Sequence, residues 1–355
     1  MIELCNRKYF DVDLRRYFGD AASVVGIRRY TLSEGRARGC EIVEVTTGSG
    51  LVYEVNATRG MDLGRCSFRG IPIAYQSYDR EVNPVYYEPF NDGWLRSYAG
   101  GMLVTCGLSS TGSPQHDRGE TLPLHGRISN IPAENISVGD DLGDSGLLKV
   151  TGRMREAKAL NYNLTLTRSV SSAVGSSTII IDDVIENRGF ESQELMILYH
   201  FNIGHPIVDE GTTLLSSSSS VVPRDDDAAN QGEPFGSYLA PTPHYKDIVY
   251  YHRLNADDGG MCHVGLVNER VGLGVGLRFK RDELDCLTQW KFLGEGNYVA
   301  GIEPGNAFVS GRSIERSEGR IKTIGPQEKR HFRVELDVLT SMSQIEALKR
   351  ETRTD

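Results

Sequence analysis

Short apolar runs separated by glycine-containing turns follow one another along almost the whole chain of 355 residues. Clear examples lie within residues 40–57, 177–187, 194–201 and 272–280, and 39 glycines are scattered between such runs. Many runs have the length of β-strands, and helical periodicity is visible only near residues 340–351. The pattern predicts an all-β fold built as one large sandwich, with a short C-terminal helix.

Residues 214–245 are rich in serine, proline, glycine and aspartate, a composition that also suits an interdomain linker. The strand-like stretches on either side, residues 195–203 and 247–254, are similar in character, whereas a domain boundary would more often separate different compositions. We therefore interpret residues 214–245 as a long loop within a single domain that spans residues 1–355, with residues 1–30 as an N-terminal extension.

The formal net charge is −9, from 48 acidic and 39 basic side chains without a long block of one sign. This balance argues against nucleic acid or an anionic membrane as a partner. The N-terminus has no apolar signal-peptide segment and no stretch is long enough to span a bilayer, which predicts a cytoplasmic protein. The six cysteines lie far apart without a CxxC pair, so we expect reduced, mostly buried thiols.

The segment LYHFNIGHP, residues 198–206, ends an apolar strand with ionisable and polar side chains. Strand alternation places His200 on one face with aliphatic neighbours, Asn202 follows two residues later, and His205 lies in the loop beyond. A metal site of His200, His205 and Asp209 is one interpretation, but the spacing is a weak match to zinc or iron sites, and we predict no metal. A histidine satisfied within the core is a further alternative.

The segment TLPLHGRISNIPAE, residues 121–134, places His125 and Arg127 on either side of Gly126. A glycine between two ionisable residues allows backbone and side chains to approach a ligand closely. The alternative interpretation is an ordinary surface turn.

The segment TQWKFLGEGNYVAGIEPGNA, residues 288–307, brings Glu303 to the end of an apolar strand, directly before Pro304. A carboxylate in that position is placed for chemistry at the rim of a sheet, although a surface ion pair is also consistent with the sequence. Trp290 and Lys291 would suit a sugar platform with a polar contact beside it.

The motifs HFNIGHP, LHGRISN and GIEPGNA together resemble the aldose 1-epimerase, or galactose mutarotase-like, superfamily. The longer segments GWLRSYAGGMLVTCGLSSTGSP, NATRGMDLGRCSFRGIPIAY and YHFNIGHP are similar to one aldose-epimerase-like branch of it, DUF4432, across nearly the whole chain. The resemblance implies a galactose mutarotase-like β-supersandwich whose concave face binds a free sugar, with a glutamate as general base and a histidine as general acid.

Carried over to this sequence, the resemblance assigns the base to Glu303 and a sugar-binding role to His125. Strict alignment puts Leu198 at the family's acid position. Residues 198 and 200 point to the same face of a strand, about 6.6 Å apart, so we assign the acid to His200. An arginine that mutarotases place near the sugar has no counterpart, and Arg59, Arg96 and Arg127 are the available substitutes. Besides His125, the predicted sugar contacts are Arg127, Arg59, Asn202, His205, Trp290, Lys291 and Trp94.

The resulting prediction is an isomerase of carbohydrate metabolism that interconverts sugar anomers by acid–base catalysis, with no cofactor and with a small-molecule carbohydrate as its partner. The identity of the sugar and the oligomeric state are left open. One alternative is a non-catalytic sugar-binding protein that uses Trp94, Trp290 and Tyr199 as platforms. Another is an epimerase for a phosphorylated sugar, in which Arg59, Arg96 and Arg127 would converge at the cleft rim.

Overall fold

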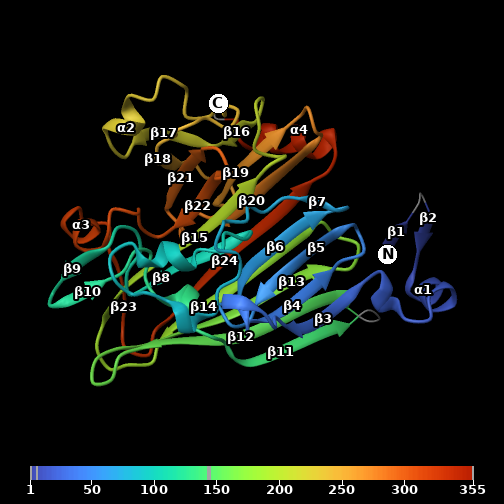
Figure 1. The fold of residues 1–355 in the computed structure, drawn as a ribbon, viewed down its shortest axis with the longest axis horizontal. Helices are drawn as coiled ribbons and strands as arrows, with labels where there is room; N and C mark the ends of the chain where they lie inside the picture. The colour runs from blue at the N-terminus through green and yellow to red at the C-terminus, as the bar shows by residue number, and fades with distance from the viewer. Residues whose placement is uncertain (1, 5–6, 142–144, 354–355) are drawn as a thin grey trace.

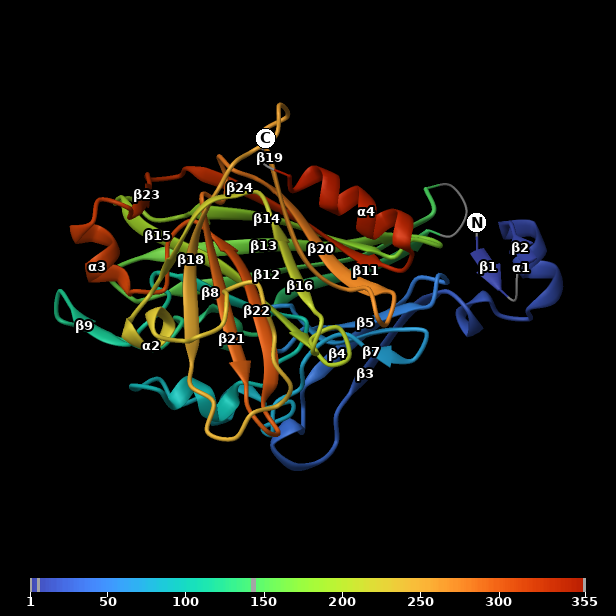
Figure 2. The same cartoon turned by 90° about the horizontal axis from the view of Figure 1, so that it is seen from above.

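Two large antiparallel β-sheets pack face to face in the computed structural model, which describes residues 2–4, 7–141 and 145–353. Figures 1 and 2 show this sandwich from two directions. The all-β supersandwich predicted from the sequence is confirmed, and so is the short C-terminal helix, which is α4 (Met342–Glu351).

The first sheet has eight strands. In spatial order they are β11 (Glu134–Asp141), β12 (Leu147–Ala157), β13 (Asn163–Ala173), β14 (Thr178–Asn187), β24 (Lys329–Leu339), β20 (Leu273–Lys280), β19 (Met261–Asn268) and β16 (Thr213–Ser216). The late strand β24 lies between β14 and β20, so this sheet joins segments that are far apart in the chain.

The second sheet has twelve strands and carries the site described below. Ten of them follow one another in the order β17 (Ser218–Pro223), β18 (Ile248–Leu254), β21 (Cys286–Leu293), β22 (Tyr298–Gly305), β15 (Gln193–Gly204), β8 (Leu103–Leu108), β6 (Asp62–Phe68), β5 (Leu51–Asn56), β4 (Glu41–Thr46) and β3 (Gly26–Thr31). The other two, β23 (Lys322–Ile324) and β7 (Ile71–Pro72), pair with β15 and β6.

Smaller elements complete the described chain. The short strand pairs are β1 (Ile2–Leu4) with β2 (Arg7–Tyr9) and β9 (Gln115–Asp117) with β10 (Glu120–Leu122). The remaining helices are α1 (Asp11–Tyr17), α2 (Asp226–Ala229) and α3 (Arg312–Ser317). The 3-10 turns are η1 (Ala21–Ser23), η2 (Gly35–Ala37), η3 (Pro84–Tyr86), η4 (Gly93–Ser97) and η5 (Ile128–Asn130).

Strand β15 separates the core of the sandwich from the site. Ile197, Tyr199 and Phe201 point into the core between the two sheets, whereas Leu198 and His200 point to the opposite face. This alternation is the one expected from the sequence, and it follows from the two-residue period of a strand.

A buried ion pair of the eight-stranded sheet makes hydrogen bonds to the twelve-stranded sheet behind the site. The guanidinium of Arg168 donates to both carboxylate oxygens of Asp183 at 2.9 and 2.6 Å, and the Tyr199 hydroxyl donates to Asp183 at 2.7 Å. Arg168 also donates to the Thr105 hydroxyl at 2.8 Å. A charge pair this deep in an apolar core is stable only when its hydrogen-bonding groups are satisfied, which these contacts achieve.

One sequence-based expectation about organisation changes in detail. Residues 214–245 are not one long loop, because their first part forms β17 and most of β16, and α2 follows. The chain crosses from the eight-stranded to the twelve-stranded sheet at Ser217, so serine-rich sequence here forms edge strands. The N-terminal elements β1, β2 and α1 lie outside the two large sheets and project from one end of the molecule (Figures 1 and 2).

The five cysteines in the described part of the chain are buried and free, and Cys5 lies outside the described residues. Across the same described ranges, none of the helices is both long and apolar enough to cross a membrane.

Candidate active site

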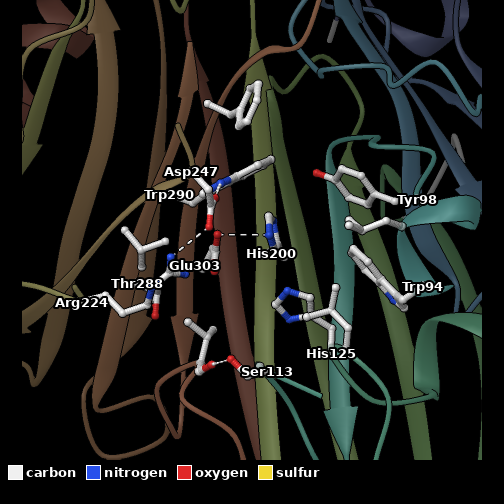
Figure 3. A pocket seen from close by; sticks show the side chains of 16 residues that line it. Trp94, Tyr98, Ser113, His125, His200, Arg224, Asp247, Thr288, Trp290 and Glu303 are labelled. Atoms are coloured by element: carbon white, nitrogen blue, oxygen red, sulfur yellow. Dashed lines mark hydrogen bonds and ion pairs between the residues drawn. The ribbon is translucent and has the colours of Figure 1, made fainter. Parts of the chain in front are cut away.

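A cavity of about 370 Å³ opens on the face of the twelve-stranded sheet that points away from the sandwich core. Side chains of β15, β21 and β22 form its base. Residues of η4, the turn at His125 and the two ends of the loop between β17 and β18 form its walls (Figure 3). The cavity therefore collects residues from all three segments that the sequence marked as candidates for chemistry.

His200 and Glu303 face each other at the base of this cavity. They project from the neighbouring antiparallel strands β15 and β22, and Nε2 of His200 lies 3.2 Å from Oε1 of Glu303 (Figure 3). Both side chains are almost fully buried, at 6% and 2% exposure. The sequence placed each of them at the end of an apolar strand, and strand pairing brings the two together.

Gly301 makes room for the Glu303 carboxylate. The two residues share a face of β22, and a Cβ atom at Gly301 would lie 2.4 Å from Oε1 of Glu303. It would also lie 3.0 Å from Cβ of Trp290 on the neighbouring strand β21. Any larger residue at this position would displace the carboxylate or the indole.

Burial shifts the pKa values of the pair in opposite directions. Loss of hydration raises the pKa of Glu303 well above its usual value; the nearby Asp247 carboxylate raises it further and Arg224 partly opposes the shift. Loss of hydration lowers the pKa of His200 to about 4. Both shifts favour the uncharged form of each group, so a single proton in the pair is held by Glu303 in preference to His200.

The turn at His125 is held against the end of β8. Gly126 has φ +78°, and a Cβ atom there would lie 2.3 Å from the carbonyl oxygens of Gly107 and Ser110. The backbone N–H of Gly107 donates to the His125 carbonyl at 3.1 Å. The glycine therefore lets the turn approach β8, and the turn presents the His125 ring to the cavity, 5.5 Å from the His200 ring. Burial, assisted by His200, lowers the pKa of His125 to about 3.

Aromatic rings surround His200. Trp94 stacks on Tyr98 with ring centroids 4.8 Å apart, and Trp290 meets the His200 ring edge-to-face at 5.4 Å. The Tyr98 hydroxyl donates to Oδ1 of Asn202 at 2.7 Å. Asn202 is fully buried and is not among the residues that line the cavity. It orients the Tyr98 ring from behind, which gives it a supporting position in place of the sugar contact that the sequence suggested.

The polar wall opposite these rings was not predicted from the sequence. Arg224 and Asp247 lie at the end of β17 and just before β18, and their side chains are 3.0 Å apart. Arg224 also contacts Asp225 at 2.7 Å, and Nε1 of Trp290 donates to Asp247. These residues meet only because β17 pairs with β18, and nothing in the intervening loop sequence indicates that pairing.

Several buried polar atoms around the cavity have no hydrogen-bond partner within the described ranges of the chain. They are Nδ1 of His200, Nδ1 of His125, Oγ1 of Thr288 and Oε1 of Glu303, whose contact with Nε2 of His200 at 3.2 Å is not a hydrogen bond. Thr288 is the direct cross-strand neighbour of Glu303. Buried polar groups normally find a partner, so these atoms are available for hydrogen bonds to a polar ligand.

The three substitute arginines do not converge on this cavity. Arg59 is buried and donates to backbone carbonyls that include Ser129 at 3.4 Å, and Arg127 donates to the Thr121 carbonyl at 3.1 Å. Arg96 is exposed and lies 3.3 Å from Glu88. The convergence that would favour a phosphorylated sugar is therefore not found, and Arg224, the arginine that does line the cavity, already contacts two carboxylates.

Three other predicted contacts lie elsewhere. Lys291 follows Trp290 in β21 and therefore points to the other face, where its ammonium donates to the Ser237 carbonyl at 3.2 Å. His205 is exposed beyond the end of β15. Tyr199, considered as a platform, points into the core toward Asp183. The residues of the predicted set that line the cavity are Glu303, His200, His125, Trp94 and Trp290.

No group of three or more histidine, cysteine, aspartate or glutamate side chains is arranged to hold a metal ion in the described ranges 2–4, 7–141 and 145–353.

Residues 37–338 match the family model described as "Domain of unknown function (DUF4432)". No curated protein sequence matches the chain. A proposed aldose 1-epimerase from Klebsiella pneumoniae subsp. pneumoniae has the same fold with a TM-score of 0.87 and 28% sequence identity, over 92% of this chain and 86% of that one.

More distant structures share the fold. A galactose mutarotase-like protein from Clostridium acetobutylicum has a TM-score of 0.62 at 15% identity, with 89% of this chain and 99% of that chain covered. A galactose 1-epimerase from Lactobacillus acidophilus has a TM-score of 0.58 at 13% identity, with the same two coverages.

Proposed function

The chain belongs to the DUF4432 family and has the galactose mutarotase-like fold, and we propose that it is an isomerase of the aldose 1-epimerase type that interconverts the anomers of a free sugar. The proposal extends to this chain an activity that the names of similar structures carry. Its support within the chain comes from the cavity on the twelve-stranded sheet.

The observation that carries the proposal is the convergence of unpartnered polar atoms beside an acid–base pair. Glu303, His200, His125 and Thr288 each present a buried polar atom without a hydrogen bond to the described chain. A sugar offers hydroxyl groups that donate and accept, while its apolar ring faces can pack on Trp94 and Trp290. Few other small molecules can form hydrogen bonds with these polar atoms and pack on these aromatic rings at the same time.

Anomer exchange needs one group that accepts a proton and one that donates a proton. The base removes the proton of the C1 hydroxyl while the acid protonates the ring oxygen, and the open-chain aldehyde then closes on its other face. Glu303 serves as the base and His200 as the acid. When the ring closes again the proton transfers run in reverse, so the pair ends each turnover with the single proton it held at the start.

Because burial favours the neutral form of both groups, a single proton in the free pair is held by Glu303 in preference to His200, and sugar binding must move it to His200. A C1 hydroxyl that donates to the Glu303 carboxylate favours the charged form of the carboxylate, and a ring oxygen that accepts from His200 favours the imidazolium. The contact of 3.2 Å between Nε2 and Oε1 makes this transfer a short one. The pair then has the charges that the mechanism requires.

The test is a set of free aldoses incubated with the purified full chain, with anomer exchange followed by exchange-NMR spectroscopy against the uncatalysed rate. Acceleration for at least one free aldose supports the proposal. Saturable sugar binding without acceleration would instead identify a non-catalytic sugar-binding protein, and acceleration only for sugar phosphates would move the substrate to the phosphorylated class.

A further inference from the structure

A second cavity lies behind the turn that presents His125 to the cavity of the candidate active site. Its volume is about 560 Å³, and it is lined by residues that include Arg127, Asn130 and Tyr87. The Tyr87 hydroxyl donates to the Gly126 carbonyl at 3.2 Å, so the side chain braces the turn between His125 and Arg127. His125 and Arg127 lie on either side of Gly126 and line different cavities: His125 lines the cavity on the twelve-stranded sheet, and Arg127 lines the second cavity.

Arg127 has no acidic partner within the described part of the chain. Its Nη2 donates to the Thr121 carbonyl, whereas Nη1 is buried and makes no hydrogen bond to the described residues. A buried guanidinium N–H without an acceptor is costly, and the planar group is suited to a carboxylate or phosphate that accepts two parallel hydrogen bonds. The arginine expected to orient the sugar is therefore available at a different site.

The other charged groups of this cavity leave it open to an anion. Arg155 and Lys158 add two cationic side chains, and Glu120 and Glu156 add two carboxylates. Glu156 is occupied elsewhere, because it accepts from the backbone N–H groups of Leu108 at 2.7 Å and Ser109 at 3.2 Å.

The remaining pairs around this cavity are loose. Glu120 lies 3.8 Å from both Lys158 and Arg312, and Arg155 lies 3.4 Å from Glu134. Among the charged side chains that line the cavity, three are cationic and two are anionic, in a chain whose overall net charge is −9.

Asn130 indicates a second property of the ligand. Its Oδ1 is buried without a donor in the described chain, while its Nδ2 donates to the Ser129 hydroxyl at 3.3 Å. An unpaired acceptor beside an unpaired guanidinium is complemented by a molecule that carries both a negative charge and a hydroxyl donor.

We propose that this second cavity binds a small hydroxyl-bearing anion, a phosphate or a carboxylate, through Arg127. Hydrogen phosphate, a sugar phosphate and a hydroxy acid share this chemistry. This proposed anion site is independent of the proposed anomer exchange, because the experiment measures binding of the anion and not turnover of a sugar.

The experiment is isothermal titration calorimetry of the full chain at low ionic strength with inorganic phosphate, glucose 6-phosphate, gluconate and acetate as separate ligands. We expect saturable binding of at least one of the first three and weaker binding of acetate, which lacks a hydroxyl. Arg127→Ala should weaken that binding about tenfold or more, because hydrogen bonds to a charged group are lost. Arg96→Ala, at an exposed arginine outside both cavities, should leave it unchanged.

Two further variants complete the test. Lys158→Ala changes a half-exposed side chain and should weaken anion binding several-fold, and Arg127→Lys should weaken it to an intermediate degree. Glu303→Gln should not change it. The proposal is overturned if none of the first three ligands binds, if Arg127→Lys and Lys158→Ala both bind like the wild type, or if Glu303→Gln weakens anion binding as much as Arg127→Ala.

Discussion

Nε2 of His200 lies 3.2 Å from Oε1 of Glu303, at the base of a cavity that buries both side chains. Burial raises the pKa of the carboxyl group and lowers the pKa of the imidazole, so a single proton in the pair favours Glu303 over His200. This relationship determines how activity and stability should respond to pH, and the predictions below start from it.

Catalysed anomer exchange should have a bell-shaped pH profile. A second proton enters the pair below the pKa of His200, at about 4, and removes the base. The single proton leaves above the raised pKa of Glu303 and removes the acid. We expect kcat/KM for exchange, measured by NMR against pH, to be highest between these two limits.

The His200→Asn variant separates the roles within the pair. If Glu303 is the base and His200 the acid, this variant should have a lower maximal rate and no alkaline limb, because deprotonated Glu303 is then the only form required. If the rate of the variant instead falls as Glu303 loses its proton, Glu303 is the acid and His200 is the base. The control is His205→Asn, at an exposed position outside the cavity, which should keep both limbs.

Glu303→Gln should make the protein more stable near neutral pH. A group whose pKa is higher in the folded than in the unfolded state stabilises the fold below the unfolded pKa, about 4.3 for glutamate, and loses that contribution as pH rises. The loss for Glu303 is about 1.4 kcal/mol for each pH unit up to its folded pKa. Glutamine does not titrate, so the melting temperature of the variant should exceed that of the wild type at pH 7. The difference should shrink toward pH 4.5, and a constant difference would show that Glu303 has an ordinary pKa.

Gly301→Ala should abolish most activity while the fold is retained. The added methyl group would lie 2.4 Å from Oε1 of Glu303, so the carboxylate must move away from His200. Misplacing a catalytic group by about 1 Å costs roughly 10²-fold in rate. Gly139→Ala is the matched control, since it also adds a methyl group within a strand, β11, and meets no atom within 4 Å. Equal exchange rates for the two variants would contradict this role of Gly301.

Trp290 and Lys291 are adjacent in sequence, and their replacement should have different consequences. Trp290→Ala removes an aromatic ring from the base of the cavity and should raise KM for the sugar by up to about tenfold. Lys291→Met acts on the opposite face, where it removes the hydrogen bond to the Ser237 carbonyl, and should lower stability by about 1–3 kcal/mol with little change in KM. Michaelis constants and thermal unfolding of both variants distinguish these outcomes, and a large KM effect of Lys291→Met would place the lysine at the sugar.

Much of the fold could be predicted from local patterns. Glycine-punctuated apolar runs indicated an all-β sandwich, and alternation in residues 194–201 placed His200 and Tyr199 on opposite faces. The pattern also placed Glu303 at the end of a strand. These features depend on the two-residue period of a strand, which a sequence displays directly.

The contacts that could not be predicted depend on strand pairing. Arg224 and Asp247 meet because β17 pairs with β18, and Thr288 faces the cavity because it is opposite Glu303. Arg59 and Arg127 are close in sequence to motif residues, but backbone turns direct them elsewhere. Register between distant strands is not encoded in any short segment, so such partners could not be found by reading motifs.

The most direct measurement of the central claim is anomer exchange catalysed by Glu303→Gln beside the wild type, with the folded state of both confirmed by thermal unfolding. Loss of a positioned base should lower the catalysed rate roughly 10²–10⁴-fold. Glu295→Gln makes the same change at an exposed position in the turn between β21 and β22 and should keep the wild-type rate. A Glu303→Gln variant that exchanges anomers as fast as the wild type would contradict the acid–base role of the Glu303–His200 pair.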